Sequence, residues 1–336
     1  MDMAFTENLT PLSRNGEEIQ PDICLSSLRD ASCLLQQFGN SPDASFRKRL
    51  VASITDPANR ISGSYADYHN FIMDLFDLGD YALALQVCDH ALAAMPCNRE
   101  LLGDAIMACG ADGQFERGEQ YLQRAEVLPY RLWNFRLFLC SVDFLKNKLC
   151  AYPMDEGLFL RALTLADEYI RNLPFDERGY NQKAELLLMM NERQRAIGEL
   201  KRYIFDTAPD VLDSRSELIT SQCCVTLLKL LDNSNDYDFI IQICDRGLRN
   251  TAQEQPAAQI GYFVFKKALA MDAKAHIQNF EVPTTVNAAL KLYQAAYDLN
   301  RNRLYESTIE ERYAVLRPYS QEDRPLLRRE LSEPTA

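Results

Sequence analysis

The sequence predicts an all-α fold in which helical hairpins follow one another in a superhelical solenoid. Apolar residues recur at helical spacing along most of the 336 residues, and they make up 47% of the chain, which is enough for a core. Only 13 residues are glycine, and long alternating runs of Val, Ile and Thr are missing. Both facts disfavour a sheet protein.

Residues 65–96 form the clearest predicted hairpin. Two amphipathic segments flank Gly79-Asp80, which has the composition of a tight turn. Ser64 and Asp67 resemble a capping box for the first helix, with Asp in place of the usual Glu. Pro96 closes the second helix, because proline cannot continue the hydrogen-bond ladder.

A small residue recurs at one position of the second helix in successive units. The aligned positions are Ala84, Gly118, Ala162, Ala196, Ile240 and Ala289, with Ile240 as the larger exception. Their intervals are 34, 44, 34, 44 and 49 residues. A base period of 34 residues is typical of helix-hairpin repeats, so we expect about six related units over residues 64–300.

This pattern resembles the tetratricopeptide repeat (TPR) family. The first unit carries it at Tyr68, Phe71, Ile72, Leu75, Ala84, Cys88, Ala91 and Pro96. The second carries it at Leu102, Ala105, Ile106, Cys109, Gly118, Leu122 and Ala125, and the fourth at Tyr180, Ala184, Leu187, Ala196, Leu200 and Tyr203. The family's usual Trp is absent from these units, and the only Trp, Trp133, opens the third unit instead.

Segments on both sides of the repeats complete the predicted organisation. Residues 1–20 are expected to be a flexible lead, and residues 21–63 a pair of helices. Residues 301–317 are expected to form a helix that caps the last open apolar face of the stack. The polar residues 318–336 are expected to be a flexible tail.

Three units exceed the base period, at about residues 131–173, 214–251 and 257–300. In the third unit we expect one helix from about residue 131 to 149, with Asp155 capping the next; in the fifth, a helix that starts at Ser214-x-x-Glu217. About five extra residues in each helix would add about 7 Å of length. Either helix and loop lengths have drifted, or the longer hairpins form a ridge used for docking.

Charge and composition disfavour several functions. The net charge of −12 would repel a phosphate backbone, so we expect no nucleic-acid partner. No stretch approaches the roughly 18 to 20 apolar residues needed to span a membrane, and the N-terminus does not read as a secretory signal. None of the ten cysteines forms a C-x-x-C pair, so we interpret them as small, mostly buried hydrophobes in a reducing cytoplasm.

Motifs for catalysis, cofactors or metals are missing from the sequence. His69, His90 and His276 are far apart, and no H-E-x-x-H spacing occurs. Phosphate-binding glycine loops and nucleophile motifs are also absent. We therefore expect no cofactor, no metal site and no enzyme activity.

The TPR resemblance implies instead a partner-binding groove lined by the first helix of each unit. The residues that it assigns to the groove are His69, Met73, Phe76, Glu100, Met107, Arg178, Asn181 and Glu185, together with Ala66, Asp77, Gly103, Gly110, Ala111, Leu188 and Met189. Methionines suit an adaptable apolar groove, and Gly103 and Gly110 would leave room for a bound segment. Alternatively, the methionines only pack neighbouring hairpins. The family's paired Lys and Asn for binding C-terminal carboxylates are not present at these positions.

The leading functional prediction is a non-catalytic scaffold or adaptor that binds a protein or an extended peptide. An alternative is a regulatory sensor whose superhelix changes curvature when a peptide or small molecule binds. Related sensors carry a DNA-binding helix pair, but residues 21–55 lack a basic recognition helix. An accessory subunit of an enzyme would differ from a scaffold only in its partner. The sequence leaves the oligomeric state open.

Overall fold

The computed structural model describes residues 12–14, 17–19, 25, 27–38, 44–59, 61–153, 155–207, 221–231, 234–249, 257–299, 304–320 and 327. Their α-helices are α1 (Leu28–Phe38), α2 (Ala44–Thr55), α3 (Tyr65–Asp77), α4 (Tyr81–Ala94), α5 (Arg99–Asp112), α6 (Phe115–Glu126), α7 (Phe135–Ala151), α8 (Glu156–Asn172), α9 (Glu177–Met189), α10 (Arg193–Lys201), α11 (Ser221–Leu230), α12 (Tyr237–Arg249), α13 (Ala257–Ile277), α14 (Pro283–Leu299) and α15 (Glu306–Leu316). The fold class is all-α, as predicted.

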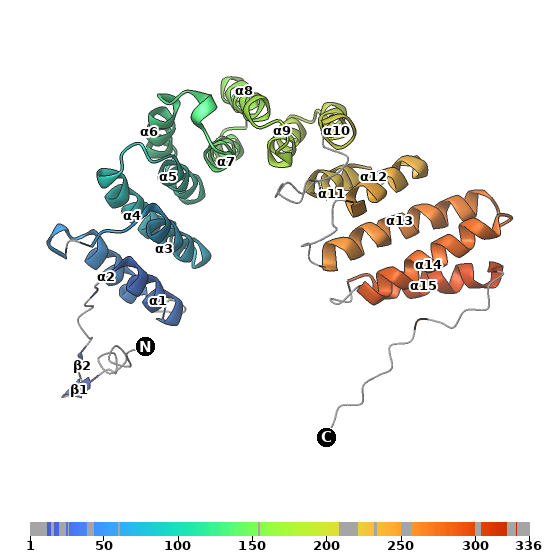
Figure 1. Cartoon of the computed structure of the whole chain (residues 1–336), viewed down its shortest axis with the longest axis horizontal. Helices are drawn as coiled ribbons and strands as arrows, with labels where there is room; N and C mark the ends of the chain where they lie inside the picture. The colour runs from blue at the N-terminus through green and yellow to red at the C-terminus, as the bar shows by residue number, and fades with distance from the viewer. Residues whose placement is uncertain are drawn as a thin grey trace. The chain divides into compact units, whose positions relative to one another are not determined.

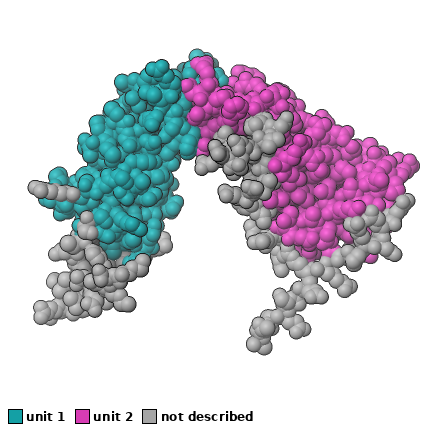
Figure 2. Space-filling model, viewed as in Figure 1, with its two compact units in different colours: residues 1–168 teal, residues 169–336 magenta. Residues whose placement is uncertain are grey.

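The chain divides into two units, residues 1–168 and residues 169–336, which Figure 2 colours separately. The division falls within α8. In unit 1 the first helices of the hairpins, α3, α5 and α7, lie along one side, and the second helices α4 and α6 lie along the other (Figure 1).

Local sequence explains where the first hairpin begins and turns. The Ser64 side chain accepts a hydrogen bond from the Asp67 amide at 3.3 Å, and the Asp67 carboxylate accepts one from the Ser64 amide at 2.9 Å. This arrangement is the predicted capping box. Gly79 turns the chain with a φ of 74°, a conformation that side chains disfavour.

Small residues in the second helices allow the hairpins of unit 1 to close. Ala84 is fully buried, and a Cβ added to Gly118 would lie 2.1 Å from Cε2 of Phe144. The ring of Phe144 therefore fills the space that glycine leaves open, and it is itself almost completely buried. The added Cβ on Gly118 would also lie 3.0 Å from Cβ of Cys109 on α5, so glycine lets the two helices of this hairpin approach closely.

The third hairpin is longer than the first, as its spacing predicts. Helices α7 and α8 have 17 residues each, whereas α3 has 13 and α4 has 14. Asp155 caps α8 by accepting a hydrogen bond from the Leu158 amide at 2.8 Å. The first helix of this hairpin begins at Phe135, later than predicted, because a 3₁₀ turn at Tyr130–Leu132 precedes it and Asn134 is its N-cap.

Unit 2 contains the fourth hairpin, α9 and α10, whose predicted Tyr180 and Tyr203 are buried with ring centroids 4.7 Å apart. A π-helical turn at Arg202–Thr207, which the sequence did not predict, continues α10. The proposed helix start at Ser214 and Glu217 lies outside the described residues, and the described part of α11 begins at Ser221.

Helix α15 packs on the last hairpin of unit 2, where the sequence places a capping helix. Its residues Ile309, Tyr313 and Leu316 join a buried cluster with Val286 and Tyr293 of α14. The open apolar face of α14 is thereby covered, which a helical repeat requires at its end.

Two short strands precede the helices. β1 (Leu12–Arg14) and β2 (Glu17–Ile19) pair antiparallel, with Leu12 opposite Ile19 and Arg14 opposite Glu17. They fall inside residues 1–20, where no strand was predicted. Within the described part of the chain, no helix combines the length and apolar character needed to cross a membrane.

Candidate functional site

The side of unit 1 formed by α3, α5 and α7 carries a buried carboxylate, Asp104, at its centre. Nε of Arg136, from α7, donates to Oδ1 of Asp104 at 2.9 Å. Nδ1 of His69, from α3, lies 3.0 Å from Oδ2. We call Asp104, Arg136, His69, Met73 and Tyr65 the Asp104 cluster, because this single carboxylate joins all three first helices.

Asp104 is completely buried, while the side chains of Arg136 and His69 remain 20% and 22% exposed. A buried charge needs a partner to offset its lost hydration, and Arg136 supplies one. Burial acts to lower the pKa of the Arg136 guanidinium, but the charge of Asp104 and hydrogen bonding to it raise that pKa overall. The Arg136 guanidinium thus stays charged, and Asp104 holds it and the His69 ring in partly exposed positions.

Tyr65 and Met73 complete the Asp104 cluster. The Tyr65 ring stacks on His69 with centroids 5.5 Å apart, and burial together with the nearby Asp104 charge raises the pKa of its hydroxyl. Nη2 of Arg136 lies 3.2 Å from the sulfur of Met73. His69 and Met73, two of the predicted groove residues, are therefore brought together by the structure.

The other predicted groove residues of unit 1 lie on the same three helices or beside them. Glu100 accepts a hydrogen bond from Nδ2 of Asn134 at 3.1 Å, which links α5 to the start of α7. Met107 is partly buried. Phe76 is also partly buried, and its ring lies 5.5 Å from that of Tyr81 on α4.

The expectation that Gly103 and Gly110 leave room for a bound segment is wrong. Both glycines are buried, and a Cβ on Gly110 would lie 3.4 Å from the Cα of Phe144. A Cβ on Gly103 would lie 3.6 Å from the Cα of Leu137. The backbone of α7 occupies this space, so the two glycines serve the close approach of α5 and α7.

The predicted groove residues of the fourth unit belong to unit 2 and contact one another or their neighbours. Asn181 is only 8% exposed; it donates to Glu185 at 2.8 Å and accepts from the Thr226 hydroxyl at 2.7 Å. Arg178 binds the carboxylate of Asp176 at 2.8 and 2.7 Å. Their assignment to a binding groove stays a prediction.

Sequence reasoning missed Asp104 and Arg136. A usable signal was present, because Asp104 interrupts the apolar run from Leu101 to Ala111, and a charge in such a run is rarely buried without a partner. Arg136 follows 32 residues later, close to one repeat period. A separation of about one period places two residues on successive first helices, which makes Arg136, near the start of α7, a partner to test.

The solved structures that this chain resembles are all distant from it in sequence. Solved structures that resemble this chain include the MamA protein, with 15% identity and a TM-score of 0.32 over 71% of this chain and 94% of that one. Another is the C-terminal part of a TPR repeat-containing protein from Cytophaga hutchinsonii, with 13% identity and a TM-score of 0.35 over 88% and 96%. A third is the TPR domain of P58(IPK), with 12% identity and a TM-score of 0.23 over 87% and 98%. No protein-family model and no curated protein matches the sequence.

Unit 1 has the features that the repeat pattern predicts. They are the 34-residue interval from Ala84 to Gly118, the capped first hairpin and the buried small positions. Unit 1 is a stack of helical hairpins of the kind that the TPR resemblance predicts.

The described residues offer little reactive chemistry. No group of three or more His, Cys, Asp or Glu residues that could hold a metal occurs within the described ranges. Cys88, Cys109 and Cys244 are buried as predicted, and burial raises the pKa of Cys109 and Cys244 to about 12. Such thiols stay protonated at neutral pH and are poor nucleophiles.

Proposed function

We propose that this chain is a non-catalytic scaffold or adaptor that binds a protein or an extended peptide on the side of unit 1 formed by α3, α5 and α7. The Asp104 cluster carries the proposal. Its buried carboxylate fixes the Arg136 guanidinium and the His69 ring in place, while about a fifth of each side chain stays exposed. Groups that are ordered before binding lose less conformational entropy when a partner arrives.

Partly buried methionines lie on the same helices as these polar groups. Met73 is in the Asp104 cluster and Met107 is on α5, one turn beyond Asp104 in the chain. Thioether side chains adapt their shape to different apolar surfaces, so they complement fixed polar donors in a binding face. The partner that suits this combination is a peptide with apolar side chains and acceptors for Arg136. A cytoplasmic location forms part of the proposal, because it would keep the free cysteines reduced.

The test combines capture of a partner with two matched variants. The full chain, immobilised, would be incubated with native lysate, and any stoichiometric protein would be identified by mass spectrometry. The double variant Met73→Glu/Met107→Glu should lose that protein, because two carboxylates would have to be desolvated against it. Met190→Glu, at an exposed position of unit 2, should retain it.

Circular dichroism would establish that all three proteins have the same helical content. Retention of the partner by the double variant at normal helicity would contradict the proposal. Recovery of no stoichiometric partner would also contradict it, as would a recovered protein that shows no saturable binding to the chain once purified.

A further inference from the structure

The Asp104 cluster presents polar atoms that have no partner within the described part of the chain. Nε and Nη2 of Arg136 donate to Oδ1 of Asp104, but Nη1 of Arg136 meets no acceptor among the described residues. Nε2 of His69 and the Tyr65 hydroxyl are also without a hydrogen-bond partner there. None of the three atoms is shielded from solvent, so a partner can reach them.

The buried carboxylate determines which hydrogen-bonding role His69 has. A carboxylate only accepts hydrogen bonds, so Nδ1 of His69, 3.0 Å from Oδ2 of Asp104, carries the proton. In a neutral imidazole the other ring nitrogen, Nε2, is then an acceptor. Arg136 has only donors. The cluster therefore presents a donor from α7 and an acceptor from α3, and one carboxylate holds both.

The charges around the cluster favour a neutral group on the partner. Asp104 pairs with Arg136, so their formal charges cancel. The pKa of the Tyr65 hydroxyl is raised by burial first and next by the Asp104 charge; Arg136 opposes this rise, and Glu100 adds to it. A carboxylate in this position would meet Asp104 and Glu100 as well as Arg136, on a chain whose net charge is −12.

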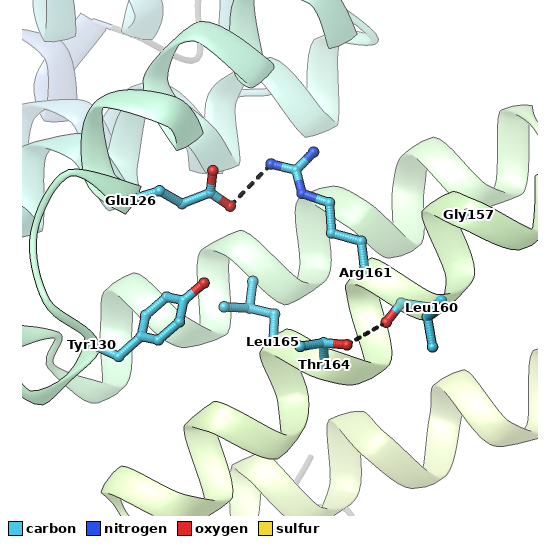
Figure 3. Close-up of a pocket in the computed structure, with 7 residues that line it drawn as sticks. All are labelled: Glu126, Tyr130, Gly157, Leu160, Arg161, Thr164 and Leu165. Atoms are coloured by element: carbon cyan, nitrogen blue, oxygen red, sulfur yellow. Dashed lines mark hydrogen bonds and ion pairs between the residues drawn. The ribbon is translucent and has the colours of Figure 1, made fainter.

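The hollow between α6 and α8 shows the opposite arrangement (Figure 3). Both terminal nitrogens of Arg161 bind carboxylates there, Nη1 that of Glu119 at 2.7 Å and Nη2 that of Glu126 at 3.0 Å. The Thr164 hydroxyl donates to the Leu160 carbonyl at 2.8 Å. These groups are satisfied within the protein, so a partner gains less from them than from the open donor and acceptor of the Asp104 cluster.

We propose that the Asp104 cluster recognises the side-chain carboxamide of an asparagine or glutamine in the partner. The carboxamide oxygen accepts from Nη1 of Arg136, and the carboxamide NH₂ donates to Nε2 of His69. A carboxylate has no donor, and an apolar side chain has neither group. This assignment rests on the proposed function, because it names the group of the partner that this face binds.

Exposure favours a side chain over the partner's backbone. Only 20% of the Arg136 side chain and 22% of the His69 side chain are exposed, so the group that reaches them must project from its own main chain. Met73, whose sulfur lies 3.2 Å from Nη2 of Arg136, offers an apolar contact to the methylene groups of such a side chain.

The first test follows the Met73 methyl group by NMR in the full chain labelled with [methyl-¹³C]methionine. The chain has nine methionines, and Met73→Leu assigns the signal. The probes are N-acetyl-glutamine methylamide and the corresponding glutamate and methionine compounds, at about pH 8, where an ordinary imidazole is neutral. The Met73 signal should shift saturably with the glutamine compound, and the other two should bind at least about fivefold more weakly. The Met190 signal, from unit 2, should not move.

Three results would overturn the carboxamide assignment. Equal affinity for all three compounds would show that their backbone amides bind instead. Affinity for the glutamate compound as high as for glutamine would show that the site accepts a carboxylate. Absence of a saturable shift with the glutamine compound would show that no carboxamide binds.

The second test removes the acceptor of His69. His69→Asn keeps an N–H donor for Asp104 but has no atom at the position of Nε2, so the glutamine compound should bind about threefold or more weakly. Binding of the methionine compound should not change. His276→Asn, at the histidine beside Asp272 in unit 2, should leave both affinities as in wild type. Wild-type affinity of His69→Asn for the glutamine compound would overturn the role of His69.

The scaffold function and the carboxamide assignment fail in different ways. If Met73→Glu/Met107→Glu loses the captured protein while His69→Asn binds it with wild-type affinity, the scaffold function stands and the carboxamide assignment is wrong. Circular dichroism of His69→Asn establishes that its helices are intact. If the double variant retains the captured protein, the face formed by α3, α5 and α7 is not its binding site, and both are wrong.

Discussion

Arg312 of α15 forms a bidentate ion pair with Asp272 of α13, a carboxylate that is completely buried in unit 2. Nε lies 2.7 Å from Oδ2, and Nη2 lies 2.9 Å from Oδ1. The Tyr293 hydroxyl of α14 donates to Oδ2 at 2.8 Å, so three helices meet at one carboxylate. Asp104 has the same role in unit 1, where it joins α3, α5 and α7.

Substitution Arg312→Ala should destabilise unit 2 strongly. Asp272 would remain buried without its cation, and loss of one partner of a buried ion pair costs about 3–5 kcal/mol. Urea unfolding, followed by circular dichroism, measures the change in the free energy of unfolding. The loss in the free energy of unfolding should be much larger than the loss caused by substituting an exposed residue.

Lys274→Ala provides the matched control, because it also removes an ion pair of α13. Its partner Asp238 is 71% exposed, and such surface pairs contribute about 0–1 kcal/mol. If the two substitutions lowered the free energy of unfolding equally, the buried Asp272 would not depend on its ion pair with Arg312.

Two glycine-to-alanine substitutions should change stability in opposite directions. Gly118→Ala should cost about 1–3 kcal/mol, because its methyl group overlaps the Phe144 ring. Gly198→Ala on α10 should stabilise by about 0.5–1 kcal/mol, since an added Cβ meets nothing within 4 Å and alanine favours a helix. Thermal unfolding of both variants measures the change in stability relative to wild type. A loss of stability in Gly198→Ala would show that the space around Gly198 is not open.

Glu177 should make unit 2 less stable as the pH rises toward neutrality. Glu177 is 8% exposed, and its carboxyl accepts a hydrogen bond from the Cys223 amide at 3.1 Å. Burial raises the pKa of Glu177 from 4.5 to about 7, against the opposing effect of the Cys223 and Gln222 amides. The folded protein therefore binds a proton here that the unfolded chain releases between pH 4.5 and 7. The contribution of this proton to the free energy of unfolding is complete below pH 4.5. It is lost as the pH rises to 7, and the loss is roughly 3 kcal/mol in total.

Glu177→Gln removes this dependence while keeping the shape of the side chain. Other carboxyl groups titrate in the same range, so the informative quantity is the difference in unfolding free energy between wild type and variant. Measured by urea unfolding from pH 4 to 8, that difference should shift in favour of the variant as the pH rises. A constant difference would show that the pKa of Glu177 is close to its ordinary value.

The sequence predicted the hairpins well because their determinants are local. The capping box at Ser64, the turn at Gly79 and the small residues Ala84 and Gly118 each depend on residues close together in the chain or on a regular period. The same reasoning placed the cap at Asp155.

The candidate site was harder to predict because its key contacts join separate repeats. Asp104 and Arg136 are 32 residues apart, and only the packing of α5 against α7 brings them together. Gly103 and Gly110 were assigned to the groove by position, although their lack of a side chain serves that same packing. The position of a residue in the repeat predicts which face of the helix it lies on. It does not predict how closely the next helix approaches that face.

The buried ring of Trp133 is an intrinsic fluorescent probe of unit 1. It is the only tryptophan in the chain, it is 3% exposed, and it packs edge to face on Tyr130. Its fluorescence emission should shift to longer wavelength when unit 1 unfolds, and it should be insensitive to unfolding confined to unit 2. Comparison of that signal with circular dichroism, which reports both units, would show whether they melt together or one after the other.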